Sequence, residues 1–100
     1  MGFWLAMLLW AAGPCGIGDG ARRAVVDGAG EIWLETVSGA EWRVALVNRG
    51  AVTISLDVVW TEIGLPVRVR VWGQKPWGVV HGGFAEKLAP GACALFRVKR

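Results

Sequence analysis

Residues 41–60 read EWRVALVNRGAVTISLDVVW, and this stretch decides the fold. Apolar side chains occupy every second position of residues 41–47, and aliphatic residues alternate with Thr53, Ser55 and Asp57 in the second half. Such period-two alternation is typical of half-buried antiparallel strands. Asn48-Arg49-Gly50 lies between the two halves. Because Asn tolerates a positive φ and Gly adopts one freely, this tripeptide predicts a tight hairpin turn.

The rest of the chain repeats the pattern in short segments. Asp27-Gly28 predicts another hairpin turn, and residues 61–65 predict one helical turn that Thr61 caps, Gly64 terminates and Pro66 stops. Residues 73–78 are expected to form a loop. The further strands are expected over residues 22–26, 31–37, 67–72, 79–81, 84–88 and 92–99. Since no helix is long enough to connect parallel strands, the sequence predicts an all-β fold, an antiparallel Greek-key β-sandwich of about eight short strands.

The N-terminus differs in character from the remainder. Residues 2–13 form an uncharged apolar run, expected to be helical and too short for a membrane span of about 20 residues. The run has the length of a signal-peptide core, which would make the protein extracellular or periplasmic. Alternatively it is a remnant helix of a larger protein, or upstream sequence given an artefactual start. We expect residues 1–20 to form this hydrophobic segment and a Gly-rich linker, and residues 21–100 to form the β-sandwich domain.

Composition points to one small domain with a surface that a partner covers. The 100 residues are 54% hydrophobic and 19% charged, whereas soluble domains carry about 25% charged residues. The net charge is +3, but the basic residues are scattered along the chain instead of forming a run. Nucleic-acid binding is therefore not expected.

The cysteines and the single histidine predict no metal site and no cofactor. Cys93 lies in an apolar strand and is most simply a buried free thiol, and a bridge from Cys15 to Cys93 is the alternative. His81 is the only histidine, and no residues have metal-ligand spacing.

The acidic residues predict no catalytic pair. All eight fall in turns or on the solvated side of strands, and Glu41 and Asp57 are expected beside cross-strand arginines. A glycosidase would need two carboxyl groups held at a defined separation. We therefore predict no catalytic residues in this chain.

The tryptophans divide into three groups. Trp42 and Trp60 bracket the strongest strands and are expected in the core, whereas Trp33 and Trp72 are expected at the sheet ends or beneath a partner domain. Trp77 lies in a Gly/Pro segment and is the tryptophan expected to be exposed. Trp77 and His81 are the candidate sugar contacts, because an exposed ring can stack on a sugar. The competing interpretation is that Trp77 folds back onto the sandwich or faces a partner domain.

A family resemblance extends over residues 21–98. Its anchors are Arg22-Arg23, Glu31-Ile32-Trp33, residues 44–50, residues 60–65, Val67-Arg68-Val69-Arg70, Trp72, Lys75, Gly78, Phe84 and Leu95-Phe96-Arg97-Val98. In order and spacing they resemble the C-terminal β-sandwich of the α-galactosidase and α-N-acetylgalactosaminidase (melibiase) family of glycoside hydrolases. Two positions depart from the family pattern: Arg70-Val71-Trp72 is one residue shorter and lacks an Asp, and Gly91-Ala92 replaces His-Gly.

The resemblance implies a function for the chain. In that family a separate (β/α)₈ barrel carries the two catalytic aspartates of a retaining mechanism. This chain would be the accessory domain or a fragment, non-catalytic by itself, which docks on a barrel in cis or on another chain. The alternative is a free-standing secreted carbohydrate-binding module that recognises galactosides.

Overall fold

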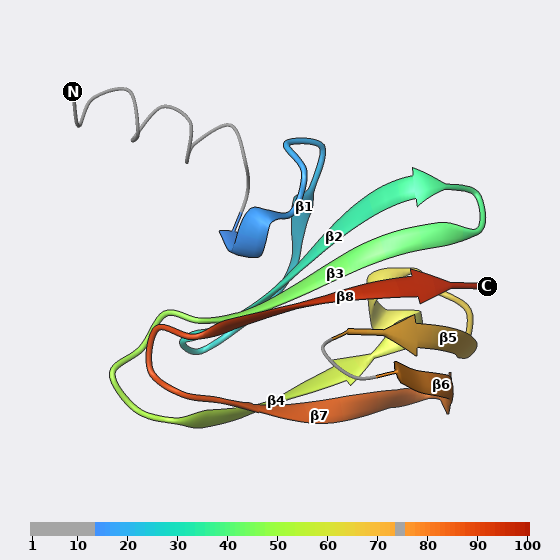
Figure 1. Cartoon of the computed structure of the whole chain (residues 1–100). Helices are drawn as coiled ribbons and strands as arrows, with labels where there is room; N and C mark the ends of the chain where they lie inside the picture. Colours follow the sequence, from blue (N-terminus) through green and yellow to red (C-terminus); the bar gives the residue numbers. More distant parts are fainter. Residues whose placement is uncertain (1–13, 74–75) are drawn as a thin grey trace.

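The computed structural model describes residues 14–73 and 76–100, which form two antiparallel sheets (Figure 1). One sheet has six strands in the order β1-β2-β3-β8-β5-β6, and the other pairs β4 with β7. The strands are β1 (Arg22–Asp27), β2 (Gly30–Ser38), β3 (Glu41–Asn48), β4 (Ile54–Val59), β5 (Arg68–Trp72), β6 (Pro76–His81), β7 (Gly83–Leu88) and β8 (Cys93–Lys99). The prediction of an antiparallel all-β fold with eight short strands is confirmed.

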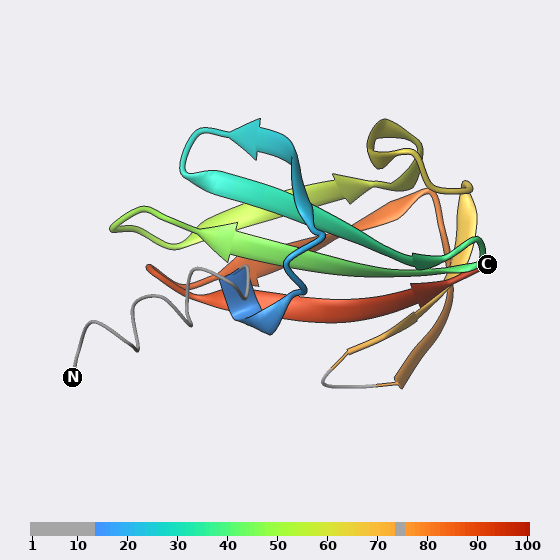
Figure 2. The same ribbon diagram turned by 90° about the horizontal axis from the view of Figure 1, so that it is seen from above.

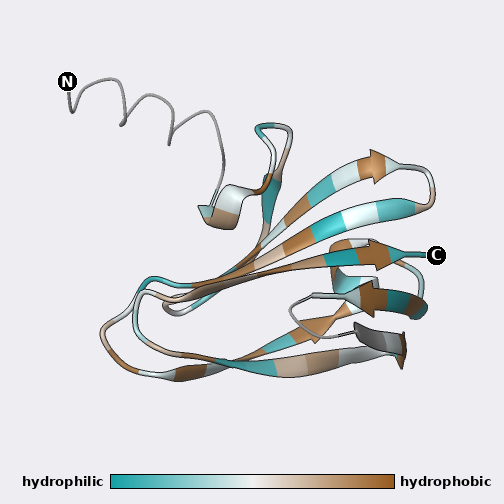
Figure 3. Cartoon of the chain, viewed as in Figure 1, coloured by the Kyte–Doolittle hydropathy of each residue, from teal (hydrophilic) through white to brown (hydrophobic). Residues whose placement is uncertain are grey.

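The core lies between the two sheets and follows the predicted alternation. Val44 and Leu46 of β3 are fully buried, and Leu56 and Val58 of β4 are almost as inaccessible. Apolar and polar residues therefore alternate in colour along the strands (Figure 3). Each such side chain contributes roughly 1.5–3 kcal/mol when it leaves water, so burial of one face per strand stabilises the sandwich.

Three aromatic rings pack against one another in one part of this core. Trp60 is fully buried, and its ring centroid lies 5.5 Å from that of Phe84. The Phe84 ring in turn lies 5.2 Å from Phe96 in an edge-on arrangement. Trp42 is also buried, at 7% exposure. The two tryptophans predicted for the core are therefore found there.

The predicted hairpin of residues 41–60 is wrong. β3 pairs with β2 and β8, whereas β4 pairs with β7 in the other sheet. The chain leaves one sheet after Asn48 and enters the other at Ile54, as the view from above shows (Figure 2). The alternation of each half was interpreted correctly, but alternation does not say which strands pair.

Asn48 gives the physical reason for this crossing. Its buried side-chain Nδ2 donates hydrogen bonds to the carbonyl oxygens of Val52 at 2.8 Å, Leu88 at 3.1 Å and Ala89 at 3.1 Å. Its Oδ1 accepts a bond from the Gly50 amide at 2.9 Å. The asparagine thus satisfies carbonyls of two separate connections, which a tight β3–β4 hairpin would not bring together.

Two local details also differ from expectation. A 3₁₀ helix, η2 (Trp60–Ile63), occupies the predicted helical turn and ends at Gly64 with a φ of 85°, but Val59 precedes it and no side chain caps it. The predicted cap at Thr61 is therefore wrong. β6 begins at Pro76, inside the predicted loop, because its backbone pairs with β5 from that residue onward.

The segment expected to be a linker lies against the six-stranded sheet. A short 3₁₀ helix, η1 (Pro14–Gly16), contacts β3 and β8 on the side away from β4 and β7 (Figure 1). Ile17 is fully buried, and the Gly18 amide donates to Glu35 Oε1 at 3.2 Å. This segment therefore covers part of the outer face of the sheet.

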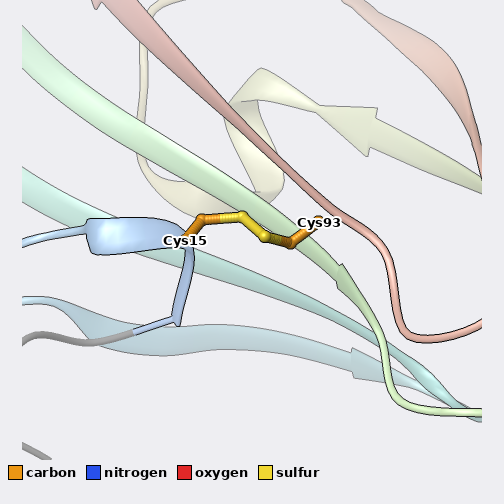
Figure 4. Close-up of a disulfide and its surroundings, with 2 residues drawn as sticks. All are labelled: Cys15 and Cys93. Atoms are coloured by element: carbon orange, nitrogen blue, oxygen red, sulfur yellow. A yellow bond between two sulfur atoms is a disulfide. The ribbon is translucent and has the colours of Figure 1, made fainter. Parts of the chain in front are cut away.

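Cys15 and Cys93 form a disulfide, with their Cα atoms 5.9 Å apart (Figure 4). Cys93 is exposed and stands opposite Val47 on the outer face. The prediction of a buried free thiol is wrong, because η1 folds over this face and brings Cys15 to it.

The expectations for residues 1–13 lie outside the described residues. Within residues 14–73 and 76–100, no helix is long and apolar enough to cross a membrane.

Candidate functional site

Basic side chains gather on the outer face of the six-stranded sheet, where β5 and β8 lie side by side. Arg68 and Arg70 of β5 are exposed, while Val69 and Val71 between and after them are buried. On β8 Arg97 is exposed and Lys99 half-buried, and the valine between them is fully buried. The strand register places Arg70 opposite Lys99 and Trp72 opposite Arg97. Alternation on two paired strands therefore collects these residues on one face.

Two hollows open on this part of the surface. The first, of about 690 Å³, is lined by Trp72, Gly73, Leu95, Arg97 and Lys99. The second, of about 290 Å³, is lined by Arg68, Val69, Arg70, Val79 and Arg100. We call the exposed tryptophan and the four basic residues on the outer side of β5 and β8 the basic face, which comprises Arg68, Arg70, Trp72, Arg97 and Lys99.

The basic face carries more positive than negative charge. Glu41 is paired with Arg97 at 3.2 Å and with Lys99 at 3.8 Å. Lys99 Nζ also lies 5.7 Å from the centre of the Trp72 ring. The side chains of Arg68 and Arg70 make no ion pair and no hydrogen bond with any residue that the structure describes. The face is therefore suited to an anionic group beside an apolar ring.

Of the two predicted sugar contacts, His81 can be placed relative to the basic face and Trp77 cannot. The side chain of Trp77 lies outside the described part of the structure. His81 is exposed at the end of β6, where its register partner is Arg68 of the basic face. Whether either residue contacts a sugar stays a prediction.

Sequence reasoning missed the basic face. It treated the basic residues as scattered, although Arg68, Arg70 and Trp72 share one side of an alternating strand. That spacing was the available signal. The sequence did not reveal that Arg97 and Lys99 of β8 join this face, because the paired residues of β5 and β8 are separated by more than 20 residues of chain.

Two half-buried carboxylates on the outer face bind neighbouring segments of the chain. Glu35 accepts hydrogen bonds from the Gly18 amide and from Arg43 Nη1, the latter at 3.4 Å. Glu31 accepts one from Trp33 Nε1 at 2.9 Å and pairs with Arg49 at 3.3 Å. These two acids join the N-terminal segment and neighbouring strands.

Glu31 is the acid with a clearly shifted pKa. Partial burial pushes the pKa of Glu31 upward, but the hydrogen bond from Trp33 and the charges of Arg49 and Arg23 outweigh it. The pKa of Glu31 therefore lies below its usual value. The carboxylate form stabilises the fold, which is a structural role.

The remaining expectations about acids have mixed outcomes. Glu41 does lie beside basic residues, as predicted. Asp57 stands opposite Ala85 of β7, so its predicted arginine neighbour is wrong, and the cause is the misassigned hairpin. Among the described residues, no three His, Cys, Asp or Glu side chains form a group that could hold a metal ion.

Comparison with known proteins identifies the fold. Neither a known family pattern nor the sequence of a curated protein matches the chain at a significant level. Among solved structures, a family 27 β-L-arabinopyranosidase from Geobacillus stearothermophilus is similar, with a TM-score of 0.75 and 18% identity. That match covers 81% of this chain and 19% of the other.

Two further structures show the same relation. An α-galactosidase from Mortierella vinacea matches 78% of this chain and 22% of its own length, with a TM-score of 0.69 and 19% identity. A Bacillus halodurans protein, provisionally assigned as an α-N-acetylgalactosaminidase, matches 79% of this chain and 20% of its own, with a TM-score of 0.71 and 15% identity. This chain thus shares the fold of one part of these enzymes, amounting to about a fifth of their length.

Proposed function

We propose that this chain is the accessory β-sandwich domain, or a fragment, of an α-galactosidase-like glycoside hydrolase. It is non-catalytic by itself and docks on a catalytic (β/α)₈ barrel, which it stabilises. The observation that carries the proposal is the extent of the structural match: 78% of this chain against 22% of the α-galactosidase from Mortierella vinacea. The remaining part of such an enzyme is where the catalytic barrel would be found.

The roles of the carboxylates support a non-catalytic domain. Glu31, Glu35 and Glu41 each take part in at least one ion pair. A catalytic pair of carboxyl groups must instead face the scissile bond from two sides. The disulfide supports an oxidising compartment for the proposed domain, since cysteines in reducing compartments are usually kept as thiols.

The experiment that tests the proposal is to sequence the DNA upstream of the Met1 codon and translate all frames. The expected result is a (β/α)₈ barrel with two catalytic aspartates that ends just before this chain. An unrelated upstream gene with no barrel would contradict the proposal. As a biochemical control, the purified chain is expected not to hydrolyse an aryl α-galactoside.

A free-standing carbohydrate-binding module is the second candidate. The exposed Trp72 ring within a hollow of about 690 Å³ favours it, because binding sites are concave and combine an apolar surface with a few polar groups. Titration with a neutral galactoside, followed by tryptophan fluorescence, tests this candidate. No change at saturating sugar would remove it.

A further inference from the structure

We propose that the basic face binds an acidic glycan, a chain of sugars that carry carboxylate or sulfate groups. The inference rests on the proposed function for the choice of a glycan as ligand, because a domain of a glycoside hydrolase is brought close to glycans. It goes further in naming a site and the charge of the ligand. The site is the pair of hollows on β5 and β8.

The charges of the basic face favour an anionic ligand. Five basic residues line the two hollows, and the carboxylate in contact with them is Glu41. The side chains of Arg97 and Lys99 have exposed fractions of 61% and 45%, and ion pairs this exposed are weak because water screens the charges. A ligand anion can therefore replace or join Glu41 at little cost.

Arg68 and Arg70 are the strongest indication of a ligand. Neither side chain makes a hydrogen bond or ion pair within the described part of the chain. Both project from one side of β5, where alternate residues lie about 6.6 Å apart. An arginine guanidinium can bind a carboxylate or a sulfate through two parallel hydrogen bonds, so this pair can hold anionic groups on successive sugars.

Trp72 adds a surface for the sugar ring. Trp72 is 36% exposed, and it lines the larger hollow together with Arg97 and Lys99. An aromatic face packs against the apolar C–H face of a sugar ring, while polar groups around the ring fix its orientation. Neighbouring strands lie about 4.8 Å apart, so a ligand that stacks on Trp72 also reaches Arg70 and Lys99.

A glycan fits this face better than a single-stranded nucleic acid does. Sites for single strands stack successive bases on several aromatic rings. Among the described side chains, Trp72 is the aromatic residue in the lining of the two hollows. Nucleic acid is therefore kept as an outcome of the test.

The test is calorimetric titration of the full 100-residue chain with three neutral or charged tetrasaccharides. They are an oligogalacturonate, a sulfated galactan oligosaccharide and an uncharged galactan oligosaccharide, and oligo-dT is titrated in parallel. At least one anionic sugar is expected to bind about tenfold more tightly than the uncharged one, since a guanidinium makes charge-assisted hydrogen bonds to an anion. Its affinity is expected to fall as salt screens the charges.

Matched variants locate the site. Arg70→Gln is expected to weaken binding about tenfold, and Trp72→Ala is expected to weaken it about fivefold through loss of aromatic contact. Arg22→Gln is the control, because Arg22 is likewise exposed and has no ion pair among the described residues, but lies on β1. It is expected to leave binding unchanged, and thermal unfolding of each variant verifies the fold.

Three results would overturn the inference. They are equal binding of charged and uncharged sugars, equal effects of Arg70→Gln and Arg22→Gln, and tighter binding of oligo-dT than of either anionic sugar. Failure here is separable from failure of the proposed function. A barrel encoded upstream with no anionic sugar bound removes this inference alone, whereas sugar binding without an upstream barrel removes the accessory role alone.

Discussion

Asn48 lies fully buried where the chain leaves the six-stranded sheet, and its amide bonds to two connections between the sheets. The Asn48 side chain makes hydrogen bonds to the backbone at the point where a β3–β4 hairpin would have formed backbone hydrogen bonds of its own. Glu31 and Glu35 act similarly on the outer face, where each accepts hydrogen bonds from two different parts of the chain. Asn48 and Glu35 therefore also bind segments outside the strands, at Val52, Ala89 and Gly18.

Asn48→Ala is expected to lower the free energy of unfolding by about 2–4 kcal/mol, because it leaves three carbonyls and one amide without their partner. Urea unfolding followed by tryptophan fluorescence measures the loss. Ser38→Ala is the control, since Ser38 Oγ accepts one exposed hydrogen bond, from the Ala40 amide. Similar losses in the two variants would show that Asn48 does not hold the crossing.

The lowered pKa of Glu31 predicts that the free energy of unfolding depends on pH. Because its pKa is lowered in the folded state, its stabilisation is present above the unfolded pKa and is lost as the pH falls through the folded value. Glu31→Gln is therefore expected to be less stable than the wild type at pH 7, and the difference should shrink on acidification. Thermal unfolding from neutral to acid pH measures this.

A control separates this effect from general acid sensitivity. Glu62→Gln removes an exposed carboxyl on η2 that has no ion pair among the described residues. It is expected to follow the wild-type curve throughout. A constant difference between wild type and Glu31→Gln at every pH would show that the ionised carboxylate is not what stabilises the fold.

At the scale of elements, the chain crosses between the sheets at several short connections. The β6–β7 crossing uses Gly82 and Gly83, with φ values of 82° and 155°. The Gly82 amide donates to the Val67 carbonyl at 2.6 Å, and the Gly82 carbonyl accepts from the Trp60 amide at 3.0 Å. Gly83 then opens β7 opposite Val59. Backbone of this shape requires residues without a side chain.

Gly83→Ala is expected to destabilise the domain by at least about 2 kcal/mol, because a Cβ there would collide with the carbonyl oxygen of Val58 in a strained conformation. Chemical denaturation gives the value. Gly39→Ala is the matched control, since a Cβ at Gly39 meets nothing within 4 Å. Its stability is expected to change by less than about 1 kcal/mol. A neutral Gly83→Ala would mean that the crossing can rearrange.

At the scale of the whole molecule, one covalent bond ties the N-terminal segment to the last strand. The cysteines are 78 residues apart, so their disulfide closes most of the chain into a loop. Small domains bury a limited fraction of their surface, and cross-links often supply the missing stability. Here the bridge also keeps Ile17 on the outer face of the sheet.

The double variant Cys15→Ala/Cys93→Ala is expected to lose about 4.5 kcal/mol of unfolding free energy, the loop-closure value for a loop of this length. Urea unfolding with and without a thiol reductant measures it. The reductant should destabilise the wild type and leave the double variant unchanged. A wild type that ignores the reductant, with a fully reduced thiol count, would contradict this role.

The candidate site was partly predictable from the sequence. Arg68 and Arg70 alternate with valines, which puts both on one side of a strand, and in the structure both are exposed. Their neighbours Arg97 and Lys99 could not be assigned to the same face, because pairing of β5 with β8 is a long-range event. The sugar contacts proposed for Trp77 and His81 remain predictions.

The sequence by itself determined the strands of this protein, since alternation and turn residues act through neighbouring positions and the sterics of the backbone. It also determined which side of β3 and of β4 faces the core between the sheets. Only the tertiary structure decided that β3 and β4 separate, that Cys15 meets Cys93 and that the basic residues converge. Those outcomes depend on the packing of segments far apart in the chain, where several pairings satisfy the same local pattern and the total burial and hydrogen bonding select one.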